Sequence, residues 1–216
     1  MALTLYMHPL SSYCHKSLIA LYENAIAFTP EVVNLGDPVS RDNFRKLWPM
    51  AKFPVLHDGE RGKTIPESTS IIEYLHRHRR GPVPLLPGDD PERLAQVRET
   101  DRFFDLHVHY HMQRIVADKL RPPDGHDPIG VSESKERLQT ALQIAEGQMA
   151  TRRWACGAAF TMADCAAAPP LFFINIMTPL FNQYPHLSAY LDRMTKRPSY
   201  ARVLQEAEPY LQYFPK

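Results

Sequence analysis

The sequence predicts an α/β N-terminal domain of element order βαβαββα, followed by an all-helical C-terminal domain. Two observations lead to this prediction. Short apolar runs alternate with helical patterns over roughly the first 80 residues, and beyond residue 90 the apolar spacing is helical almost throughout. Residues 81–88, between the two halves, are dense in Pro and Gly, which is typical of a domain boundary. We therefore expect domains at residues 1–80 and 91–216, joined by a linker over 81–90.

Local patterns predict the elements of the first domain. Its first strand is stopped by His8 and Pro9, and a helical pattern follows. Trp48-Pro49 ends the second helix, because a residue before proline is disfavoured in the helical region. Asp58-Gly59 between two strand-like runs predicts a hairpin. The expected strands cover residues 3–7, 26–33, 53–57 and 63–65, and the expected helices cover about 12–24, 40–47 and 66–80.

The second domain is predicted to consist of helices separated by turns and loops. The first is long, and Pro122 to Gly125 interrupts the chain after it. Pro169-Pro170 falls inside a strongly apolar helix, where proline is expected to produce a kink. The expected helices cover residues 91–120, 132–150, a stretch from about 161 onward, 186–196 and 199–206.

Composition excludes several classes of partner. Lys and Arg number 25 against 24 Asp and Glu, a net charge of +1, so no global charge favours nucleic acid or an anionic membrane. No apolar run approaches the roughly 18 residues that span a bilayer, and no secretory signal is evident at the N-terminus. The three cysteines are odd in number and widely spaced, which favours reduced thiols. We expect a cytoplasmic protein that binds a small ligand.

The turn after the first strand carries the first chemical motif. Ser11 and Ser12 stand where the N-cap of the following helix falls. A helix start offers backbone N–H groups and the positive end of the helix dipole to an anion, and a thiolate is one such anion. Taken alone, a Ser-Ser pair before an apolar run is equally the mark of an ordinary helix cap.

Two further motifs lie later in the same domain. Phe53-Pro54 places a proline at the mouth of a strand, and composition alone predicts a trans peptide bond there. Glu67 and Ser68 follow Pro66 at a helix start, where backbone N–H groups together with the Ser68 hydroxyl can hold a carboxylate. Each motif taken singly is also explained as a cap or a turn.

Together, the order and spacing of these motifs resemble the cytosolic glutathione transferase family over essentially the whole chain. Four segments carry the resemblance: SSYCHKSLIAL, WPMAKFPVL, IPESTSIIEYL and FTMADCAAAPP. The last is similar to the family's internal capping box, with Thr161 as N-cap and Asp164 three residues on. The resemblance implies a thioredoxin-like N-terminal domain, a cis peptide bond before Pro54, an all-helical C-terminal domain and a role in detoxification.

The resemblance also implies a glutathione site, with glutathione as cosubstrate and no metal. Ser11 aligns with the hydroxyl that donates a hydrogen bond to the glutathione sulfur. Phe53 and Pro54 would hold the cysteinyl part of the tripeptide as an added strand. Glu67 would receive the ammonium group of the γ-glutamyl end and Ser68 its carboxylate. Lys52 would reach the glycyl carboxylate, although a solvated lysine is an equal alternative.

The first turn departs from parts of the family. The zeta class, which includes maleylacetoacetate isomerase, reads Ser-Ser-Cys here, whereas this chain has Tyr13 in place of that cysteine and Cys14 after it. Glutaredoxins and the omega class have a cysteine at the position of Ser11, so disulfide exchange is not expected from this turn. Tyr6 stands where the alpha, mu and pi classes place a catalytic tyrosine. It is the alternative to Ser11.

The second domain is expected to line the pocket for a small hydrophobic electrophile, with Phe104, His107 and His111 as candidates on its long helix. His107 and His111 are four residues apart, but no third ligand stands at a suitable spacing, so no metal site is predicted. The leading hypothesis is a glutathione S-transferase that forms a homodimer. The alternatives are a glutathione-dependent isomerase of the maleylacetoacetate isomerase type and a non-catalytic binding scaffold.

Overall fold

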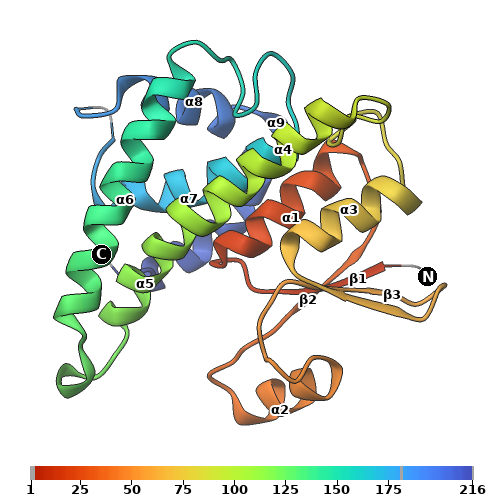
Figure 1. Cartoon of the computed structure of the whole chain (residues 1–216). Coiled ribbons are helices and arrows are strands. Elements are labelled where there is room, and N and C mark those ends of the chain that lie inside the picture. The colour runs from red at the N-terminus through yellow and green to blue at the C-terminus, as the bar shows by residue number, and fades with distance from the viewer. Residues whose placement is uncertain (1–2, 181, 216) are drawn as a thin grey trace. The chain divides into compact units, whose positions relative to one another are not determined.

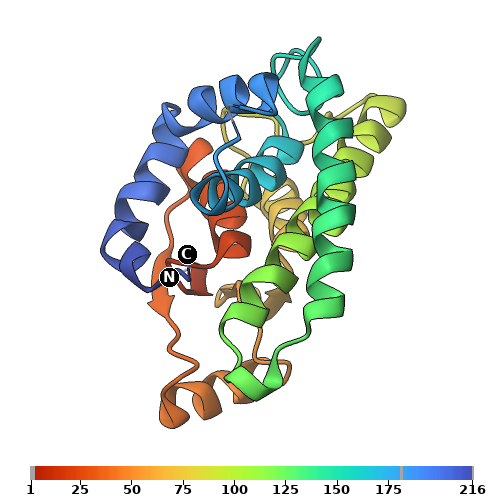
Figure 2. The same ribbon diagram turned by 90° about the vertical axis from the view of Figure 1, so that its left-hand side faces the viewer.

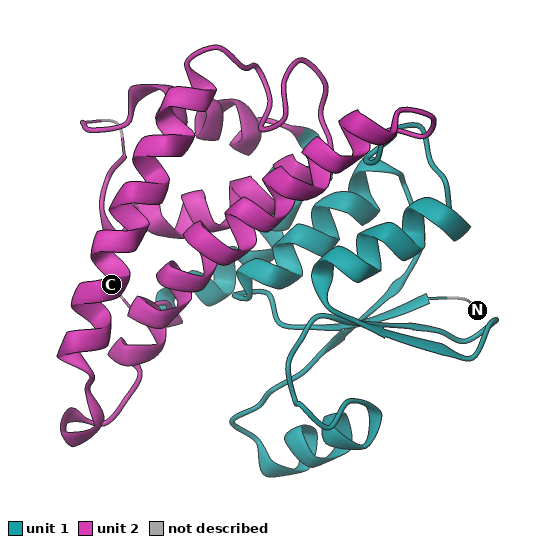
Figure 3. Ribbon diagram, in the orientation of Figure 1, with its two compact units in different colours: residues 1–86, 198–212 teal, residues 87–197, 213–216 magenta. Residues whose placement is uncertain are grey.

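The computed structural model describes residues 3–180 and 182–215. By its internal contacts the chain divides into two compact units, shown in Figure 3. Unit 1 comprises residues 1–86 and 198–212, and unit 2 comprises 87–197 and 213–216. Among the described residues, no helix has both the length and the apolar character needed to cross a membrane.

Unit 1 contains a four-stranded sheet of order β2-β1-β3-β4. β1 pairs in parallel with β2, while the β1–β3 and β3–β4 pairs are antiparallel. In Figure 1, α1 and α3 lie on one face of the sheet and α2 on the other. The elements are β1 (Leu3–Met7), α1 (Ser12–Glu23), β2 (Thr29–Val32), α2 (Pro38–Leu47), β3 (Val55–Asp58), β4 (Lys63–Pro66) and α3 (Ser68–His78).

The register of this sheet brings distant parts of the sequence to one end of it. Tyr6 in β1 pairs with Val55 in β3, and Val55 pairs in turn with Pro66 in β4. β1 ends one residue beyond that row, β3 begins on it and β4 ends on it. The segments that follow β1, precede β3 and follow β4 therefore leave the sheet at the same end.

The last part of the chain returns to unit 1. α9 (Pro198–Ala207) and η3 (Glu208–Tyr213) follow the helices of unit 2 in sequence, and α9 packs against α1. The Tyr22 hydroxyl donates to the Glu206 carboxylate at 2.7 Å, and the buried Tyr200 ring meets His15 edge-on. Residues 198–212, which the sequence predicted to lie in the helical domain, are grouped with the first unit by their contacts.

Within the described residues of unit 2 the secondary-structure elements are helices, as the sequence predicted, apart from one isolated β-bridge between Trp154 and Gly157. In Figure 2 the long helix α6 runs beside α5, and α5 and α6 are in contact. The elements are α4 (Pro91–Phe103), η1 (Phe104–His109), α5 (Tyr110–Lys119), η2 (Pro123–Gly125), α6 (Pro128–Met149), α7 (Met162–Met177) and α8 (Pro185–Thr195).

In unit 2, the sequence did not predict a π-helical segment but did predict the capping box of a buried helix. The long helix predicted over residues 91–120 is interrupted by η1, a six-residue π-helical segment between α4 and α5. The predicted capping box at α7 is confirmed. Asp164 accepts the backbone N–H of Thr161 at 2.8 Å, and its other oxygen accepts the N–H of Ala155 at 2.7 Å. α7 is buried along most of its length, so these hydrogen bonds lie inside unit 2.

Candidate functional site

Ser11 is the N-cap of α1, and its hydroxyl can donate a hydrogen bond in addition to the one it accepts in the cap. Its backbone is extended, and its Oγ accepts the N–H of Cys14 at 3.3 Å. The Ser11 N–H in turn donates to the carbonyl of His8 at 2.9 Å, which closes the turn after β1. Since Oγ acts as an acceptor in the cap, the hydroxyl proton remains available to donate to an anion at the helix start.

The turn that carries Ser11 is held from within the helix by His15. The His15 Nε2 lies 2.6 Å from the carbonyl oxygen of Pro9, and the side chain is fully buried. Burial lowers the pKa of His15 to about 4, so the ring is neutral at pH 7 and donates its Nε2–H to that carbonyl. His15 therefore fixes the turn without placing a charge beneath the helix start.

Cys14 also lies at this helix start, but its thiol is not activated as a nucleophile. The side chain is fully buried, and burial raises the pKa of the thiol to about 12 despite hydrogen bonds at Ser11 and His8 that act in the opposite direction. A thiol of that pKa is protonated at neutral pH and is a poor nucleophile.

The peptide bond between Phe53 and Pro54 is cis, as the family resemblance implied. Pro54 is buried at the start of β3. The Phe53 ring stacks on the His8 imidazole with centroids 6.0 Å apart. The Tyr210 ring of η3 meets the His8 imidazole edge-on with centroids 5.5 Å apart. The His8 Nδ1 accepts the N–H of Leu10 at 3.2 Å, and burial lowers the pKa of His8. His8 is thus a neutral imidazole between two aromatic rings.

Glu67 immediately precedes α3 in an unusual backbone conformation. Its φ is 70° and its ψ is 124°, and its side chain makes no capping hydrogen bond. A positive φ in a residue other than glycine costs about 1–3 kcal/mol and is concentrated at functional sites. Ser68 follows as the first helical residue and is buried. As at any helix start, the N–H groups of residues 68–70 have no acceptor within the helix.

A buried lysine connects the two helix starts. Lys16 of α1 is fully buried, and its Nζ donates to the Thr69 Oγ1 in the first turn of α3 at 2.8 Å. A buried ammonium group is costly unless it is hydrogen-bonded or neutralised. Its position against the first turn of α3 places positive charge close to backbone N–H groups that favour an anion.

The other two residues predicted for this site have plain surroundings. Tyr6 is half-buried in β1, and its ring stacks on Phe44 of α2 with centroids 6.0 Å apart. That contact belongs to a small apolar cluster around Val33, Phe44 and Val55. Lys52 is exposed in the loop before Phe53.

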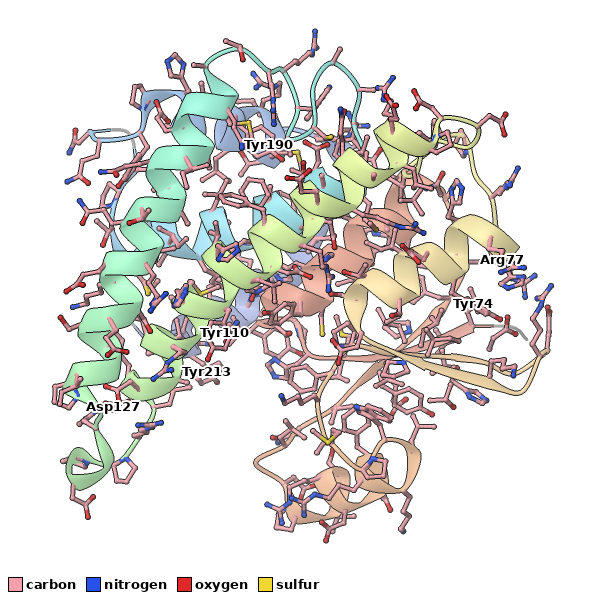
Figure 4. The ribbon with its side chains drawn as sticks, viewed as in Figure 1. Tyr74, Arg77, Tyr110, Asp127, Tyr190 and Tyr213 are labelled. Atoms are coloured by element: carbon pink, nitrogen blue, oxygen red, sulfur yellow. The ribbon has the colours of Figure 1, made fainter. Side chains whose placement is uncertain are left out.

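The three residues proposed for the electrophile lie on η1 and α5 of unit 2 and differ in exposure. Phe104 is fully buried, whereas His107 is exposed and His111 is half-buried. Burial, with Arg137 and His107 nearby, lowers the pKa of His111. Figure 4 labels Tyr110, which begins α5 between the two histidines in sequence. No group of three or more His, Cys, Asp or Glu side chains suited to a metal occurs among the described residues.

Sequence reasoning missed His8, His15 and Lys16 as parts of this site. His15 and Lys16 belong to a helix that is buried on every side from Cys14 to Leu21, so their polarity does not mark a solvent-facing stripe. The signal available was a pair of polar, titratable residues inside an apolar helical pattern. Such residues need partners when buried, which makes them candidates for positioning a site.

Three sequence motifs therefore converge in unit 1. The row Tyr6, Val55 and Pro66 sets the turn with Ser11, the cis Pro54 and the Glu67-Ser68 helix start at one end of the sheet. A thioredoxin-like domain with an anion-favouring helix start, followed by a helical domain, defines the class of protein. Family models give the same result: residues 5–97 match the glutathione S-transferase N-terminal domain, and residues 103–198 match its C-terminal domain. The chain belongs to the glutathione S-transferase family.

Two distant relatives and one solved structure match nearly the full chain. Glutathione S-transferase F10 of Arabidopsis thaliana is 27% identical, covering 94% of this chain and 96% of its own. FtsZ-localized protein A of Caulobacter vibrioides is 26% identical, covering 95% and 92%. The solved structure of a glutathione S-transferase from Methylobacillus flagellatus with GSH bound has a TM-score of 0.85 at 24% identity, covering 94% and 98%.

Proposed function

We propose that this protein binds glutathione, stabilises its thiolate and transfers it to a small hydrophobic electrophile. The observation that carries the proposal is the sheet row Tyr6, Val55 and Pro66, because it sets three weak sequence motifs at the same end of one sheet. A cap, a proline turn and a helix start are each unremarkable alone. Their convergence beside two helix N-termini fits an extended ligand with an anion near each of them.

Each part of glutathione then has a group suited to it. The Ser11 hydroxyl donates to the sulfur, and the main chain of Phe53, next to Pro54, pairs with the cysteinyl unit. The start of α3 receives the γ-glutamyl carboxylate through Ser68, and Glu67 receives the ammonium group. Lys52 is exposed and is proposed to reach the glycyl carboxylate.

The chemical step requires a lowered thiol pKa. A free thiol has a pKa of about 8.5, and lowering it by about 2 units requires about 2.7 kcal/mol of preferential stabilisation of the thiolate. One charge-assisted hydrogen bond from Ser11 and the dipole of α1 together have this magnitude. The thiolate then attacks the electrophilic carbon, a C–S bond forms, and the electron pair of the broken bond leaves with the departing group or is protonated.

The unusual backbone of Glu67 supports a ligand role for α3. Its φ of 70° is unfavourable for glutamate, and the side chain does not cap the helix that it precedes. The conformation therefore brings no visible benefit to the fold. A residue in such a conformation is expected where a ligand needs its side chain or its main chain in a particular orientation.

The experiment that tests the proposal is a pH titration of the ultraviolet absorbance of the thiolate of bound glutathione. We expect the pKa of the bound thiol to lie about 2 units below that of free glutathione. Ser11→Ala should remove the larger part of this pKa shift while glutathione still binds, because only the contribution of the α1 dipole remains, and Tyr6→Phe should leave the thiol pKa unchanged. A shift that survives Ser11→Ala and disappears in Tyr6→Phe would assign the role to Tyr6 instead.

A binding scaffold is the second candidate. It is favoured by one relative, 26% identical, that is named for localisation with FtsZ and not for a reaction. The same titration distinguishes the two candidates, because a scaffold has no need to lower the pKa of a bound thiol. Glutathione bound with its ordinary thiol pKa would support the scaffold.

No observation favours the isomerase, since Tyr13 stands where the zeta-class cysteine would be.

Three further parts of the proposal follow the family. We propose a homodimer, tested by sedimentation, for which a mass near 24.8 kDa would be the contrary result. Phe104, His107 and His111 are proposed to contact the electrophile, so His107→Ala and His111→Ala should change the relative kcat/KM for different electrophiles. We propose a cytoplasmic location, which the three free cysteines favour.

A further inference from the structure

His8 has a side chain that the proposed function leaves unused. It follows β1 directly, is half-buried and belongs to the turn that carries Ser11. Its imidazole has two nitrogens, and the fold occupies one of them. The Nδ1 accepts the N–H of Leu10 at 3.2 Å, whereas the Nε2 has no hydrogen-bond partner within residues 3–180 and 182–215.

The contact with Leu10 determines which nitrogen of His8 carries the proton. A backbone N–H can only donate, so the Nδ1 that receives it must present a lone pair. An imidazolium would instead place a second N–H against that of Leu10, so the geometry favours the neutral ring with its hydrogen on Nε2. Burial lowers the pKa of His8, which acts in the same direction. At neutral pH the Nε2–H is therefore a hydrogen-bond donor that has no acceptor in the described part of the chain.

The turn after β1 places this donor close to the groups proposed to hold the cysteinyl part of glutathione. The Ser11 N–H donates to the His8 carbonyl at 2.9 Å, so these are the first and fourth residues of a turn. The Cα atoms at those two turn positions lie within about 7 Å of each other. The His8 ring also stacks on Phe53, with centroids 6.0 Å apart. His8 therefore neighbours both the hydroxyl proposed for the sulfur and the residue proposed to pair with the cysteinyl main chain.

The orientation of the His8 ring is fixed by its surroundings in unit 1. Phe53 stacks on the ring, and Tyr210 of η3 meets it edge-on with centroids 5.5 Å apart. The backbone is restricted by Pro9, which follows His8, and the Pro9 carbonyl is held by the buried His15 at 2.6 Å. A donor that is already in place loses little freedom in a transition state, which makes its hydrogen bond more effective there.

We propose that the Nε2–H of His8 donates a hydrogen bond to the oxygen of the electrophile, which makes the enzyme selective for α,β-unsaturated carbonyl compounds. This inference rests on the proposed function. The glutathione sulfur would lie at Ser11 and the carbonyl oxygen at His8, with the rings of Phe53 and Tyr210 beside the apolar body of the electrophile. An alkyl halide has no such oxygen, so it gains nothing from this donor.

The addition to an enone develops negative charge at the place where the donor stands. The thiolate forms a C–S bond with the β-carbon, and the π electrons of the C=C bond move toward the carbonyl. The oxygen thereby gains the charge of an enolate, which the Nε2–H of His8 stabilises while it stays on the imidazole. Water then protonates the α-carbon, and the hydroxide formed takes up the proton that the glutathione thiol released on ionisation.

The test compares two aromatic electrophiles: benzylideneacetone, which is an enone, and benzyl chloride, from which chloride leaves. His8→Phe keeps a ring against Phe53 and Tyr210 but removes the donor. We expect kcat/KM for benzylideneacetone to fall about 100-fold, and kcat/KM for benzyl chloride to change less than about threefold. The Leu10 N–H loses its acceptor in both reactions alike, so the ratio of the two values isolates the donor. His8→Gln, which retains an N–H donor, should recover most of the lost kcat/KM for the enone.

His78→Phe is the matched control, because it makes the same exchange at the opposite end of α3. The His78 ring contacts the ring of Tyr74, which is labelled in Figure 4, with centroids 4.6 Å apart. His78 is the last residue of α3 and lies about 15 Å along the helix from its first residue, Ser68. Both kcat/KM values should be unchanged in this variant.

Three results would overturn the role of His8. Equal losses for the two electrophiles in His8→Phe would mean that His8 only supports the turn. A raised pKa of the bound glutathione thiol in His8→Phe would mean that the Nε2–H serves the sulfur and not the electrophile. A loss confined to the enone that appears in Tyr210→Phe but not in His8→Phe would assign the donor to the Tyr210 hydroxyl.

Measurements with glutathione separate failure of this inference from failure of the proposed function. If the parent protein binds no glutathione, or leaves the pKa of its thiol unchanged, both are wrong. If the parent binds glutathione with a lowered thiol pKa and His8→Phe keeps the same ratio of kcat/KM values for the two electrophiles, only the role of His8 is wrong. Calorimetric titration with glutathione and the absorbance titration of the bound thiolate supply these two readouts.

Discussion

Two helix starts in this molecule differ in their capping: a side chain caps the start of α7, whereas the side chain of Glu67 makes no capping hydrogen bond at the start of α3. At the start of α7, in unit 2, Asp164 is fully buried and accepts hydrogen bonds from two backbone N–H groups and from the Tyr190 hydroxyl at 3.0 Å. At the start of α3, in unit 1, Glu67 is exposed, has a positive φ and makes no capping bond. Every helix start has unpaired N–H groups. At α7 the fold supplies a partner for the N-cap N–H of Thr161, whereas at α3 the side chain of Glu67 supplies no such partner.

The largest effect on stability is expected from removing Asp164, which caps the start of α7. Asp164→Ala removes the shared acceptor of two backbone N–H groups and of the Thr161 and Tyr190 hydroxyls inside unit 2. We expect the free energy of unfolding to fall by about 4 kcal/mol, measured by urea denaturation. The control is Asp37→Ala at the exposed N-cap of α2, where about 1 kcal/mol is expected. Equal losses at the two positions would mean that burial does not set the cost.

The second effect is a pH dependence that differs in sign between the two regions. Burial raises the pKa of Asp164 to about 6, so its contribution to stability is present below pH 4 and is lost as pH rises through 6. Burial lowers the pKa of His15 to about 4, so its contribution is present above pH 6.5 and is lost as pH falls through 4. Each contribution is on the order of 3 kcal/mol.

Two variants separate these contributions. His15→Gln should reduce the loss of stability on acidification below pH 6.5, and Asp164→Asn should remove the opposing gain. Urea denaturation at pH 4, 5, 6 and 7 measures both, and hydrogen exchange of α1 and α7 amides assigns each change to its unit. A pH profile of stability that neither variant alters would show that these two groups do not titrate differently in the folded and unfolded states.

The contrast between the two helix starts also shows where sequence reasoning succeeds. The α/β and all-helical halves were predicted from local patterns, and the capping box of α7 and the cis Pro54 followed from the family resemblance. The roles of His15 and Lys16 were not predicted, since a helix that is buried on all sides gives no polar stripe. The packing of α9 on α1 joins residues that are 184 positions apart, such as Tyr22 and Glu206, and no local pattern contains it.

The start of α3 should show a separation of stability from binding. Glu67→Gly removes the side chain and relieves the unfavourable φ, so we expect stability to rise by about 1 kcal/mol and glutathione affinity to fall about tenfold. Glu67→Ala should lose the same affinity without the gain in stability. Ala25→Gly, at a φ of 49° after α1, is the control, with a stability gain and unchanged affinity. Thermal unfolding and calorimetric titration with glutathione measure the two quantities.

The smallest effect is expected at Cys14, beside the Ser11 hydroxyl at the start of α1. Its thiol has a pKa of about 12 and is fully buried, so it contributes neither a nucleophile nor a charge at neutral pH. The N–H that donates to the Ser11 Oγ belongs to the main chain and is retained in Cys14→Ala. We therefore expect kcat/KM within about twofold of the parent and an unchanged thiol pKa of bound glutathione. Iodoacetamide should modify the half-buried Cys156 well before Cys14 in the folded protein. Rapid alkylation of Cys14 at neutral pH would instead mean that this helix start activates its own sulfur, and the assignment of Ser11 as the donor to a bound thiol would need to be replaced.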